Sequence, residues 1–327
     1  MTVSGIVSGG VYPELALEVA QYIDVPIVAM TRKRFSSGER YVRFDESVRG
    51  RNLYIIQSFS EENGYTVNDA LFEVMLIIDA ARRASAGELT VVLPLLPYSR
   101  QDRKALNREP ISVAVVIRML EELGVTRIIG VDLHSPQTQA VFNGQFDHLI
   151  AQPIISKSLK DVIGNDMADY LIVSPDTGRA KESEYYADEL GVGLVHLPKA
   201  RQREDPSKIT RPSKLKGVGG KKCILIDDMI DTGGTLMSAA DTLVRSGAES
   251  VLLYATHGIL SGGAAAKIRD SAIGQLYLVD TLPQQRTKEL LGDKVTILPI
   301  APLLAESLKR VENAGSISTL FDGRNFK

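Results

Sequence analysis

Apolar positions along the first half of the chain follow two alternating periods, which predict strands and helices in turn. An apolar run at 53–58 predicts a strand, a helical pattern around Val74 follows, and 89–93 is apolar again. A helical pattern that ends at Gly124 then precedes the apolar run 127–133. Because each helix returns the chain to the same edge of the sheet, this alternation predicts parallel strands.

The second half repeats this order of elements. Residues 222–228 predict a strand, 235–246 a helix that Gly247 ends, and 250–255 another strand. A chain of 327 residues is longer than one typical domain. We therefore infer two similar α/β domains that meet near residue 150, each with a mainly parallel sheet flanked by helices.

A basic segment at 199–221 interrupts the second half. Lys and Arg stand here among Pro and Gly, without apolar periodicity. Loops of this length inside a compact domain are usually functional, and a solvated linker is the alternative interpretation.

Composition excludes several classes of protein. Lys plus Arg number 38 and Asp plus Glu 40, so no overall charge points to nucleic acid or an anionic membrane as a partner. Cys223 is the single cysteine, which excludes an internal disulfide, fits a reducing compartment and is expected in the core. No apolar run reaches the ~20 residues of a membrane span, and the N-terminus has no leader pattern. We expect a cytoplasmic location.

Two adjacent carboxylates give the most informative motif. Asp227 and Asp228 follow the apolar run 222–226, at the strand end where α/β sheets bind ligands, and they suit two neighbouring sugar hydroxyls. The following loop, 232–235, reads Thr-Gly-Gly-Thr and opens a helix, which suits a phosphate group. The motif predicts a ribose phosphate site. The alternative is an ordinary strand-to-helix turn with Asp and Thr as caps.

Three further segments suit a nucleotide and its metal. Residues 35–39 offer an aromatic face for a purine, and 100–104 place three cations after a strand, where they suit polyphosphate. Residues 132–134, matched in the second half by 174–178, offer a carboxylate and an imidazole for hydrated Mg²⁺. No Walker A loop is present, so nucleotide binding must use another scheme. No GxGxxG after a strand, no metal-spaced Cys/His set and no Ser-His-Asp nucleophile context is present, which argues against redox and acyl-transfer chemistry.

Together these segments resemble the class I ribose-phosphate diphosphokinases, or phosphoribosyl diphosphate synthetases, over nearly the whole chain. The stretches that carry the resemblance are 35–39, 46–50, 100–104, 108–112, 132–134, 174–178 and 227–235. The resemblance implies two domains of the type I phosphoribosyltransferase kind. It places an N-terminal domain for ATP base and regulatory contacts at 1–149, a C-terminal domain with the sugar site and catalytic loop at 150–303, and a tail at 304–327 that packs on the first domain.

The resemblance also implies an activity and a set of site residues. The activity is transfer of the β,γ-diphosphoryl group of ATP to the anomeric hydroxyl of ribose 5-phosphate, with Mg²⁺, giving phosphoribosyl diphosphate and AMP. The implied catalytic pair is Lys199 and Arg201, and the implied metal ligands are His134 and Asp176. The implied ATP contacts are Phe35, Ser37, Glu39, Arg100, Gln101 and His134. The implied ribose 5-phosphate contacts are Asp227, Asp228, Asp231, Thr232, Gly233, Gly234 and Thr235.

Three positions depart from the usual pattern of that family. Ser37 stands where Asn or Asp is common, Arg179 replaces a second Gly after Gly178, and Glu182 occupies a position that is often basic. The first departure bears on selection of the base. The other two lie beside the implied metal and sugar sites and bear on their local geometry.

Regulation and assembly are implied by the resemblance alone. The family binds phosphate as activator and ADP as inhibitor between subunits and forms hexamers. The matching allosteric positions are Ser47, Arg49, Arg82, Arg83, Ser316, Ser318 and Phe321. From the residues alone, a surface tail packed by Leu320 and Phe321 is the alternative.

Two other functions remain open on the sequence. A phosphoribosyltransferase would share the sugar motif without needing segments 35–39 and 100–104. A non-catalytic regulatory homologue would bind the true enzyme, and retention of Lys199, Arg201, Asp227 and Asp228 argues against it.

Overall fold

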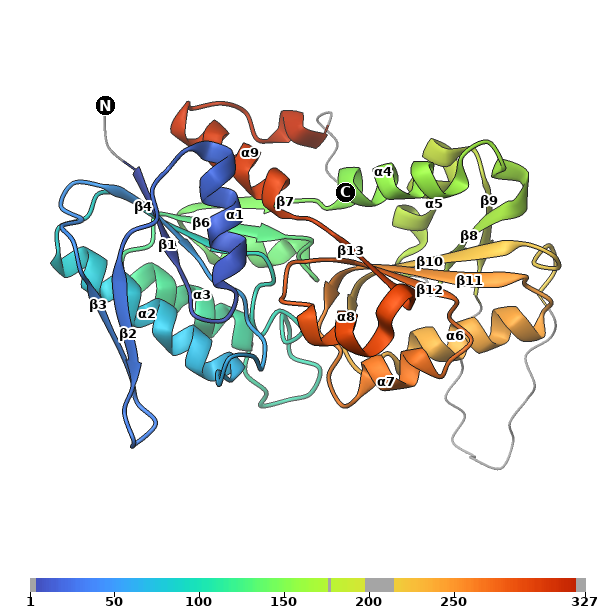
Figure 1. The fold of residues 1–327 in the computed structure, drawn as a ribbon, viewed down its shortest axis with the longest axis horizontal. Helices are drawn as coiled ribbons and strands as arrows, with labels where there is room; N and C mark the ends of the chain where they lie inside the picture. Colours follow the sequence, from blue (N-terminus) through green and yellow to red (C-terminus); the bar gives the residue numbers. More distant parts are fainter. Residues whose placement is uncertain (1–3, 176–177, 198–214, 322–327) are drawn as a thin grey trace. The chain divides into compact units, whose positions relative to one another are not determined.

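The computed structural model describes residues 4–175, 178–197 and 215–321, which divide into two compact units (Figure 1). Of the described residues, those up to 151, together with 281–283 and 299–321, belong to unit 1, and those within 152–280 and 284–298 belong to unit 2. Each unit is built around its own sheet. The predicted α/β architecture with mainly parallel sheets is therefore confirmed.

Unit 1 has a five-stranded parallel sheet in the order β1-β4-β5-β6-β7, together with a separate antiparallel hairpin, β2–β3. The strands are β1 (Ser4–Ser8), β2 (Met30–Arg34), β3 (Arg40–Phe44), β4 (Asn52–Ile56), β5 (Leu89–Leu93), β6 (Arg127–Val131) and β7 (Gln145–Leu149). The helices are α1 (Pro13–Ile23), α2 (Val67–Arg83), α3 (Ser112–Glu122) and α9 (Ala301–Glu312), with 3₁₀ turns η1 (Pro136–Val141) and η4 (Ser318–Phe321).

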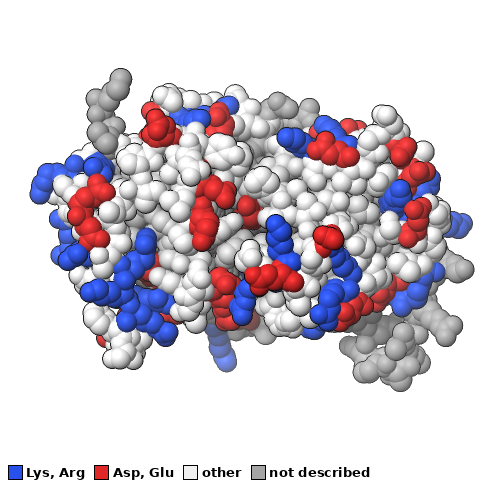
Figure 2. Space-filling view, in the orientation of Figure 1, with Lys and Arg blue, Asp and Glu red and all other residues white. Residues whose placement is uncertain are grey.

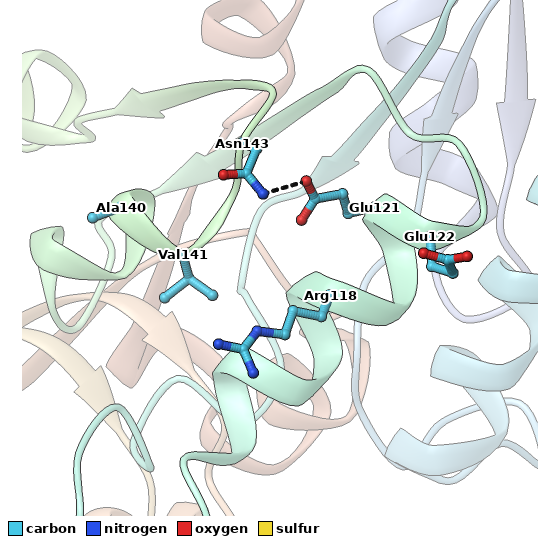
Figure 3. A pocket seen from close by; sticks show the side chains of 6 residues that line it. All are labelled: Arg118, Glu121, Glu122, Ala140, Val141 and Asn143. Atoms are coloured by element: carbon cyan, nitrogen blue, oxygen red, sulfur yellow. Dashed lines mark hydrogen bonds between the residues drawn. The ribbon is translucent and has the colours of Figure 1, made fainter.

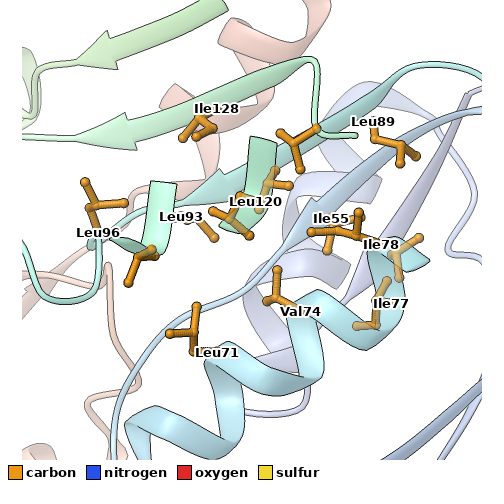
Figure 4. Close-up of a cluster of buried hydrophobic side chains, with 14 of the residues drawn as sticks. Ile55, Leu71, Val74, Ile77, Ile78, Leu89, Leu93, Leu96, Leu120 and Ile128 are labelled. Carbon is orange, nitrogen blue, oxygen red and sulfur yellow. The ribbon is translucent and has the colours of Figure 1, made fainter. Parts of the chain in front are cut away.

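The core of unit 1 lies between its sheet and helices α2 and α3. Alternate strand residues such as Ile55, Leu93 and Ile128 pack against Val74 of α2 and Leu120 of α3 (Figure 4). Helix α9 returns from the end of the chain and packs against α1. Helix α9 is thus part of unit 1.

Glu73 of α2 is buried in this unit, with 1% of its surface exposed. Its Oε1 accepts the backbone N–H of Gly10 at 2.9 Å and lies 3.8 Å from Nε of Arg32, and its Oε2 accepts the hydroxyl of Tyr65 at 2.5 Å. Burial, and then the hydrogen bond to Glu73, raise the pKa of Tyr65. This carboxylate therefore joins α2, the loop after β1 and the β2–β3 hairpin.

Unit 2 has a six-stranded parallel sheet in the order β13-β12-β11-β10-β8-β9. The strands are β8 (Tyr170–Ser174), β9 (Gly193–His196), β10 (Lys222–Ile230), β11 (Ser250–Gly258), β12 (Gln275–Val279) and β13 (Val295–Leu298). The helices are α4 (Gln152–Ile163), α5 (Ala180–Leu190), α6 (Gly234–Arg245), α7 (Ala264–Arg269) and α8 (Gln285–Leu291), with 3₁₀ turns η2 (Met167–Asp169) and η3 (Gly292–Lys294).

The core of unit 2 packs α6 and α7 on one face of the sheet, through residues such as Leu225, Leu253 and Leu243. Cys223 belongs to this core, as predicted, and burial raises the pKa of its thiol to about 11. The rings of Tyr254 and Tyr277 stack 4.2 Å apart.

Strand β10 extends further than its neighbour β8. It pairs with β8 only as far as Leu225, whereas its pairing with β11 continues to Ile230. Asp227 and Asp228 therefore lie within β10, beyond the point where β8 ends. The predicted strand 222–228 was short by two residues, Met229 and Ile230, which follow the two carboxylates and pair with His257 and Gly258 of β11.

The surface carries charges of both signs. On the face shown in Figure 2, Lys and Arg side chains are interspersed with Asp and Glu. Among the described residues, no helix is long and apolar enough to cross a membrane.

Candidate functional site

The candidate sugar site of unit 2 is built where β10 passes into α6. Gly233 has φ of 71° in the left-handed region, and its carbonyl accepts the N–H of Met237 at 2.9 Å, which starts the helix. The side chain of Asp231 accepts the hydroxyl of Ser261. Thr232, Gly234 and Thr235 are exposed, so the first turn of α6 is open to solvent. A helix N-terminus of this kind suits a phosphate group.

Gly233 and Gly234 are expected to respond oppositely to alanine. A Cβ on Gly233 would meet only ordinary contacts at 3.5 Å, but the left-handed backbone would cost about 1–2 kcal/mol. A Cβ on Gly234 meets nothing within 4 Å and stands in the helix, where alanine is favoured by about 0.5–1 kcal/mol. Thermal unfolding should show Gly233→Ala destabilised and Gly234→Ala unchanged or stabilised. Equal effects of both substitutions would contradict the assigned backbone.

The two adjacent carboxylates of β10 contact a single guanidinium. Nε of Arg179 lies 3.0 Å from Oδ1 of Asp227, and Nη2 forms an ion pair with Oδ1 of Asp228. Nη1 donates to Oε2 of Glu182 at 3.0 Å. Three carboxylates and one guanidinium therefore form one group, which we call the Arg179 cluster: Arg179, Glu182, Asp227 and Asp228.

The electrostatics of the Arg179 cluster follow from its burial. The side chain of Asp228 is 6% exposed, and those of Arg179, Glu182 and Asp227 are 23–24% exposed. Burial raises the pKa of Asp227 to about 7, which the Arg179 guanidinium opposes and the Asp228 carboxylate reinforces. Burial also raises the pKa of Glu182. Burial lowers the pKa of Arg179, but the three carboxylates outweigh this and the pKa is raised.

The contacts of Arg179 were not predicted from the sequence. Arg179 and Glu182 were identified only as departures beside a predicted site. Their signal was position, since both follow the end of β8, the strand that neighbours β10 in the sheet.

The candidate nucleotide residues of unit 1 occupy two places. Phe35, Ser37 and Glu39 form the tip of the β2–β3 hairpin, which extends beyond the body of the unit (Figure 1). Phe35 is 51% exposed, and Ser37 donates to Oε2 of Glu39 at 2.7 Å. Arg100 and Gln101 lie in the loop after β5, where the side chain of Gln101 accepts the hydroxyl of Ser112.

His134 lies at a cavity of about 530 Å³ beside the carboxyl ends of β5 and β6. Asp102 and Arg103, from the loop after β5, line the same cavity. The structure therefore brings two of the predicted nucleotide segments together. By contrast, Asp132 accepts the backbone N–H of Ala151, and His148 accepts that of Leu133 at 2.9 Å, so both make structural contacts.

A second cavity, of about 680 Å³, lies between α3 and η1 (Figure 3). Arg118, Glu121, Val141 and Asn143 line it, and Asn143 donates to Glu121 at 2.6 Å. None of the predicted site residues lines this cavity.

The predicted allosteric positions of unit 1 fall into two groups. Arg49 donates to Ser85 just beyond α2, the helix that ends with Arg82 and Arg83. Ser47 accepts the backbone N–H of Arg49. In the second group, Ser316 and Ser318 contact each other after α9, and Phe321 is buried.

Three predicted site residues lie outside the described part of the chain. They are Asp176, Lys199 and Arg201. Within the described ranges, no three His, Cys, Asp or Glu side chains gather as a set of metal ligands.

Comparisons with known proteins agree with the sequence prediction. Residues 4–124 match the family described as the N-terminal domain of ribose phosphate pyrophosphokinase, and 195–322 match the phosphoribosyl synthetase-associated domain. The chain is 41% identical to the ribose-phosphate pyrophosphokinase of Corynebacterium efficiens, over 97% of this chain and 95% of that one. It is 41% identical to the protein of that name from Streptomyces coelicolor, over 96% and 95%.

A solved structure extends the likeness to the fold. The crystal structure of phosphoribosylpyrophosphate synthetase from Mycobacterium smegmatis aligns with a TM-score of 0.85 and 39% identity. The alignment covers 95% of this chain and 100% of that one, so it includes both units. The chain therefore belongs to the ribose-phosphate pyrophosphokinase family.

Proposed function

We propose that this protein transfers the β,γ-diphosphoryl group of ATP to the anomeric hydroxyl of ribose 5-phosphate for nucleotide biosynthesis. The observation that carries the proposal is the pair Asp227–Asp228 beside the open first turn of α6, in a chain of this family. The anomeric oxygen forms a bond to the β-phosphorus, and the bond between that phosphorus and the α,β-bridging oxygen breaks. The products are 5-phosphoribosyl 1-diphosphate and AMP, and the hydroxyl proton is released.

Each group of residues has a proposed part in this reaction. Asp227 and Asp228 accept hydrogen bonds from two sugar hydroxyls. Asp231 and the backbone and hydroxyls of 232–235 hold the 5-phosphate. In unit 1, Phe35, Ser37 and Glu39 contact the base, while Arg100, Gln101 and His134 contact the rest of ATP. By resemblance, Lys199 and Arg201 neutralise the charge that develops on the transferred group.

A magnesium ion is proposed to accompany ATP, with His134 and Asp176 as its protein ligands. The surroundings of His134 fit this, because Asp102 lines the same cavity and Mg²⁺ takes few protein ligands besides phosphate oxygens and water. The ion would supply charge neutralisation at the phosphates.

Assembly and regulation are proposed on the family resemblance alone. They comprise a cytoplasmic hexamer, activation by phosphate and inhibition by ADP, with no role for nucleic acid or membrane. The proposed allosteric residues are Ser47, Arg49, Arg82, Arg83, Ser316, Ser318 and Phe321.

The proposed function is tested by incubating the purified protein with ATP, Mg²⁺ and ribose 5-phosphate, and identifying products by phosphorus NMR. AMP together with a diphosphate on the anomeric carbon, formed only when all three components are present, is the expected result. AMP formation without a nucleobase separates the reaction from that of a phosphoribosyltransferase. No turnover, even with phosphate added, would instead favour a regulatory homologue.

Activity should fall as the pH falls through about 7. The pKa of Asp227 is raised to about 7, so this side chain is the accepting carboxylate above that pH and is increasingly protonated below it. The measurement is kcat/KM for ribose 5-phosphate between about pH 5.5 and 9. Because the substrate phosphate also titrates, Asp227→Asn is the control, and its residual activity should lose this part of the pH dependence. An identical profile in both proteins would exclude Asp227 as the titrating group.

A further inference from the structure

Arg179 has no part in the proposed reaction, yet it contacts both carboxylates assigned to the sugar. Three of its contacts are directed at carboxylates: Nε at Asp227, Nη2 at Asp228 and Nη1 at Glu182. A planar guanidinium presents its donors in a fixed fork, so three simultaneous partners fix the position of the group. The two sugar-binding carboxylates are thereby held in one arrangement.

The backbone on both sides of these contacts is also fixed. Arg179 is the residue that precedes the first turn of α5, and its carbonyl accepts the N–H of Ser183 at 2.9 Å. Glu182 stands in that first turn, three residues after Arg179. Asp227 and Asp228 lie in β10 beyond its last pairing with β8, and Arg179, next to the start of α5, contacts them there. Secondary structure on each side therefore supports the cluster.

Two roles for Arg179 are conceivable, and their energies distinguish them. If the sugar displaced Arg179, the protein would have to break a buried ion pair, which changes an equilibrium constant by about two to four orders of magnitude. Two hydrogen bonds from sugar hydroxyls to charged carboxylates contribute about the same free energy as the ion pair costs to break. Little net affinity for the sugar would therefore remain. If Arg179 stays, each of its contacts to β10 is made to an Oδ1 atom, which in Asp227 also accepts the backbone N–H of Asp228 at 2.9 Å, and a carboxylate offers about four acceptor positions over its two oxygens. The second role is therefore favoured.

We propose that Arg179 is a positioning residue for the sugar: a fixed internal cation that holds Asp227 and Asp228 as a paired acceptor for two adjacent hydroxyls. Glu182 anchors the guanidinium from the side of α5. The inference rests on the proposed function and deepens it, because it assigns selectivity for a sugar with neighbouring hydroxyls to a residue outside the Asp-Asp and Gly/Thr motif. Arg179 itself does not contact the reacting atoms.

The test compares wild type with Arg179→Met and Arg179→Lys in steady-state assays with ribose 5-phosphate, its 2-deoxy analogue and ATP. In Arg179→Met, KM for ribose 5-phosphate should rise about tenfold or more, while KM for ATP stays within about twofold. The preference for ribose 5-phosphate over the 2-deoxy analogue, as a ratio of kcat/KM, should fall about fivefold or more. Arg179→Lys keeps the positive charge but lacks the planar set of donors. Its KM for ribose 5-phosphate and its selectivity should therefore lie between those of wild type and Arg179→Met.

The control is Arg269→Met, which removes an exposed arginine from the same unit. Arg269 pairs with Asp270 at 2.9 Å with its side chain 50% exposed, and all three parameters should stay at wild-type values. An unchanged KM for ribose 5-phosphate in Arg179→Met would overturn the proposal. A lower KM would also overturn it, since it would mean that Arg179 competes with the sugar.

Two further measurements keep the test decisive. If Arg179→Met does not fold, Glu182→Gln takes its place and should raise KM for ribose 5-phosphate about threefold, with an unchanged KM contradicting the anchor. Calorimetric titration with ribose 5-phosphate requires no turnover. One outcome is that wild type binds ribose 5-phosphate more tightly than Arg179→Met does and still forms no product. That result would overturn the proposed function and leave this inference standing. Wild type that binds none would overturn both.

Discussion

Replacing Asp228 by asparagine is expected to lower kcat/KM for ribose 5-phosphate by about two orders of magnitude or more. The side chain is 6% exposed and forms an ion pair with Arg179. Asparagine retains the shape but offers one acceptor oxygen, and its amide N–H groups would face either the guanidinium or the sugar. Loss of a charged hydrogen-bond acceptor and of a buried countercharge should therefore act together.

The fold should survive this substitution, since Arg179 retains Glu182 and Asp227 as partners. The measurement is AMP formation at varied ribose 5-phosphate, accompanied by thermal unfolding. Asp241→Asn is the matched control, because Asp241 is exposed on α6 of the same unit and should keep full activity. Activity of Asp228→Asn within about fivefold of wild type would show that Asp228 does not accept from the substrate.

Glu73→Leu is expected to give the largest loss of stability, about 3–5 kcal/mol in the free energy of unfolding of unit 1. Leucine is one atom shorter and cannot accept hydrogen bonds, so the hydroxyl of Tyr65, the N–H of Gly10 and the cation of Arg32 all lose an acceptor. The cost comes mainly from leaving a partly buried cation without its countercharge.

The loss should appear as a fall of about 10 °C or more in the midpoint of thermal unfolding. Glu18→Leu, at an exposed position of α1, makes the same chemical change and should shift the midpoint by no more than about 2 °C. If both variants unfold at the same temperature, Glu73 does not join the elements of unit 1 as described.

Sequence periodicity predicted individual elements well where the type of side chain determines the ends of the element. The strand predicted at 89–93 is β5, residue for residue, because Glu88 precedes the run and Pro94, which has no N–H to donate to a sheet, follows it. Helix α6 was predicted one residue late at both ends. Glu73 shows the limit of the method, since a charged residue is expected at the surface and its partners Gly10, Arg32 and Tyr65 lie outside its own helix.

The candidate sugar site was predictable in its residues but not in its partners. Asp227 and Asp228 were identifiable because a strand, two carboxylates and a Gly/Thr loop are consecutive in the chain. Their contact with Arg179 joins positions far apart in sequence and depends on β8 lying next to β10. Periodicity predicts that strands are parallel but leaves their order in the sheet undetermined.

The assignment of helix α9 to unit 1 has a consequence for biosynthesis. The first 151 residues leave the ribosome early, but α9, which packs against α1, is made only after every described residue of unit 2. Unit 1 therefore completes its packing late in synthesis, whereas the described part of unit 2 is complete once residue 298 has emerged. The nascent chain would therefore contain an incompletely packed first unit while the second one folds. An expressed fragment that stops before α9 would leave exposed the surface of α1 that α9 contacts.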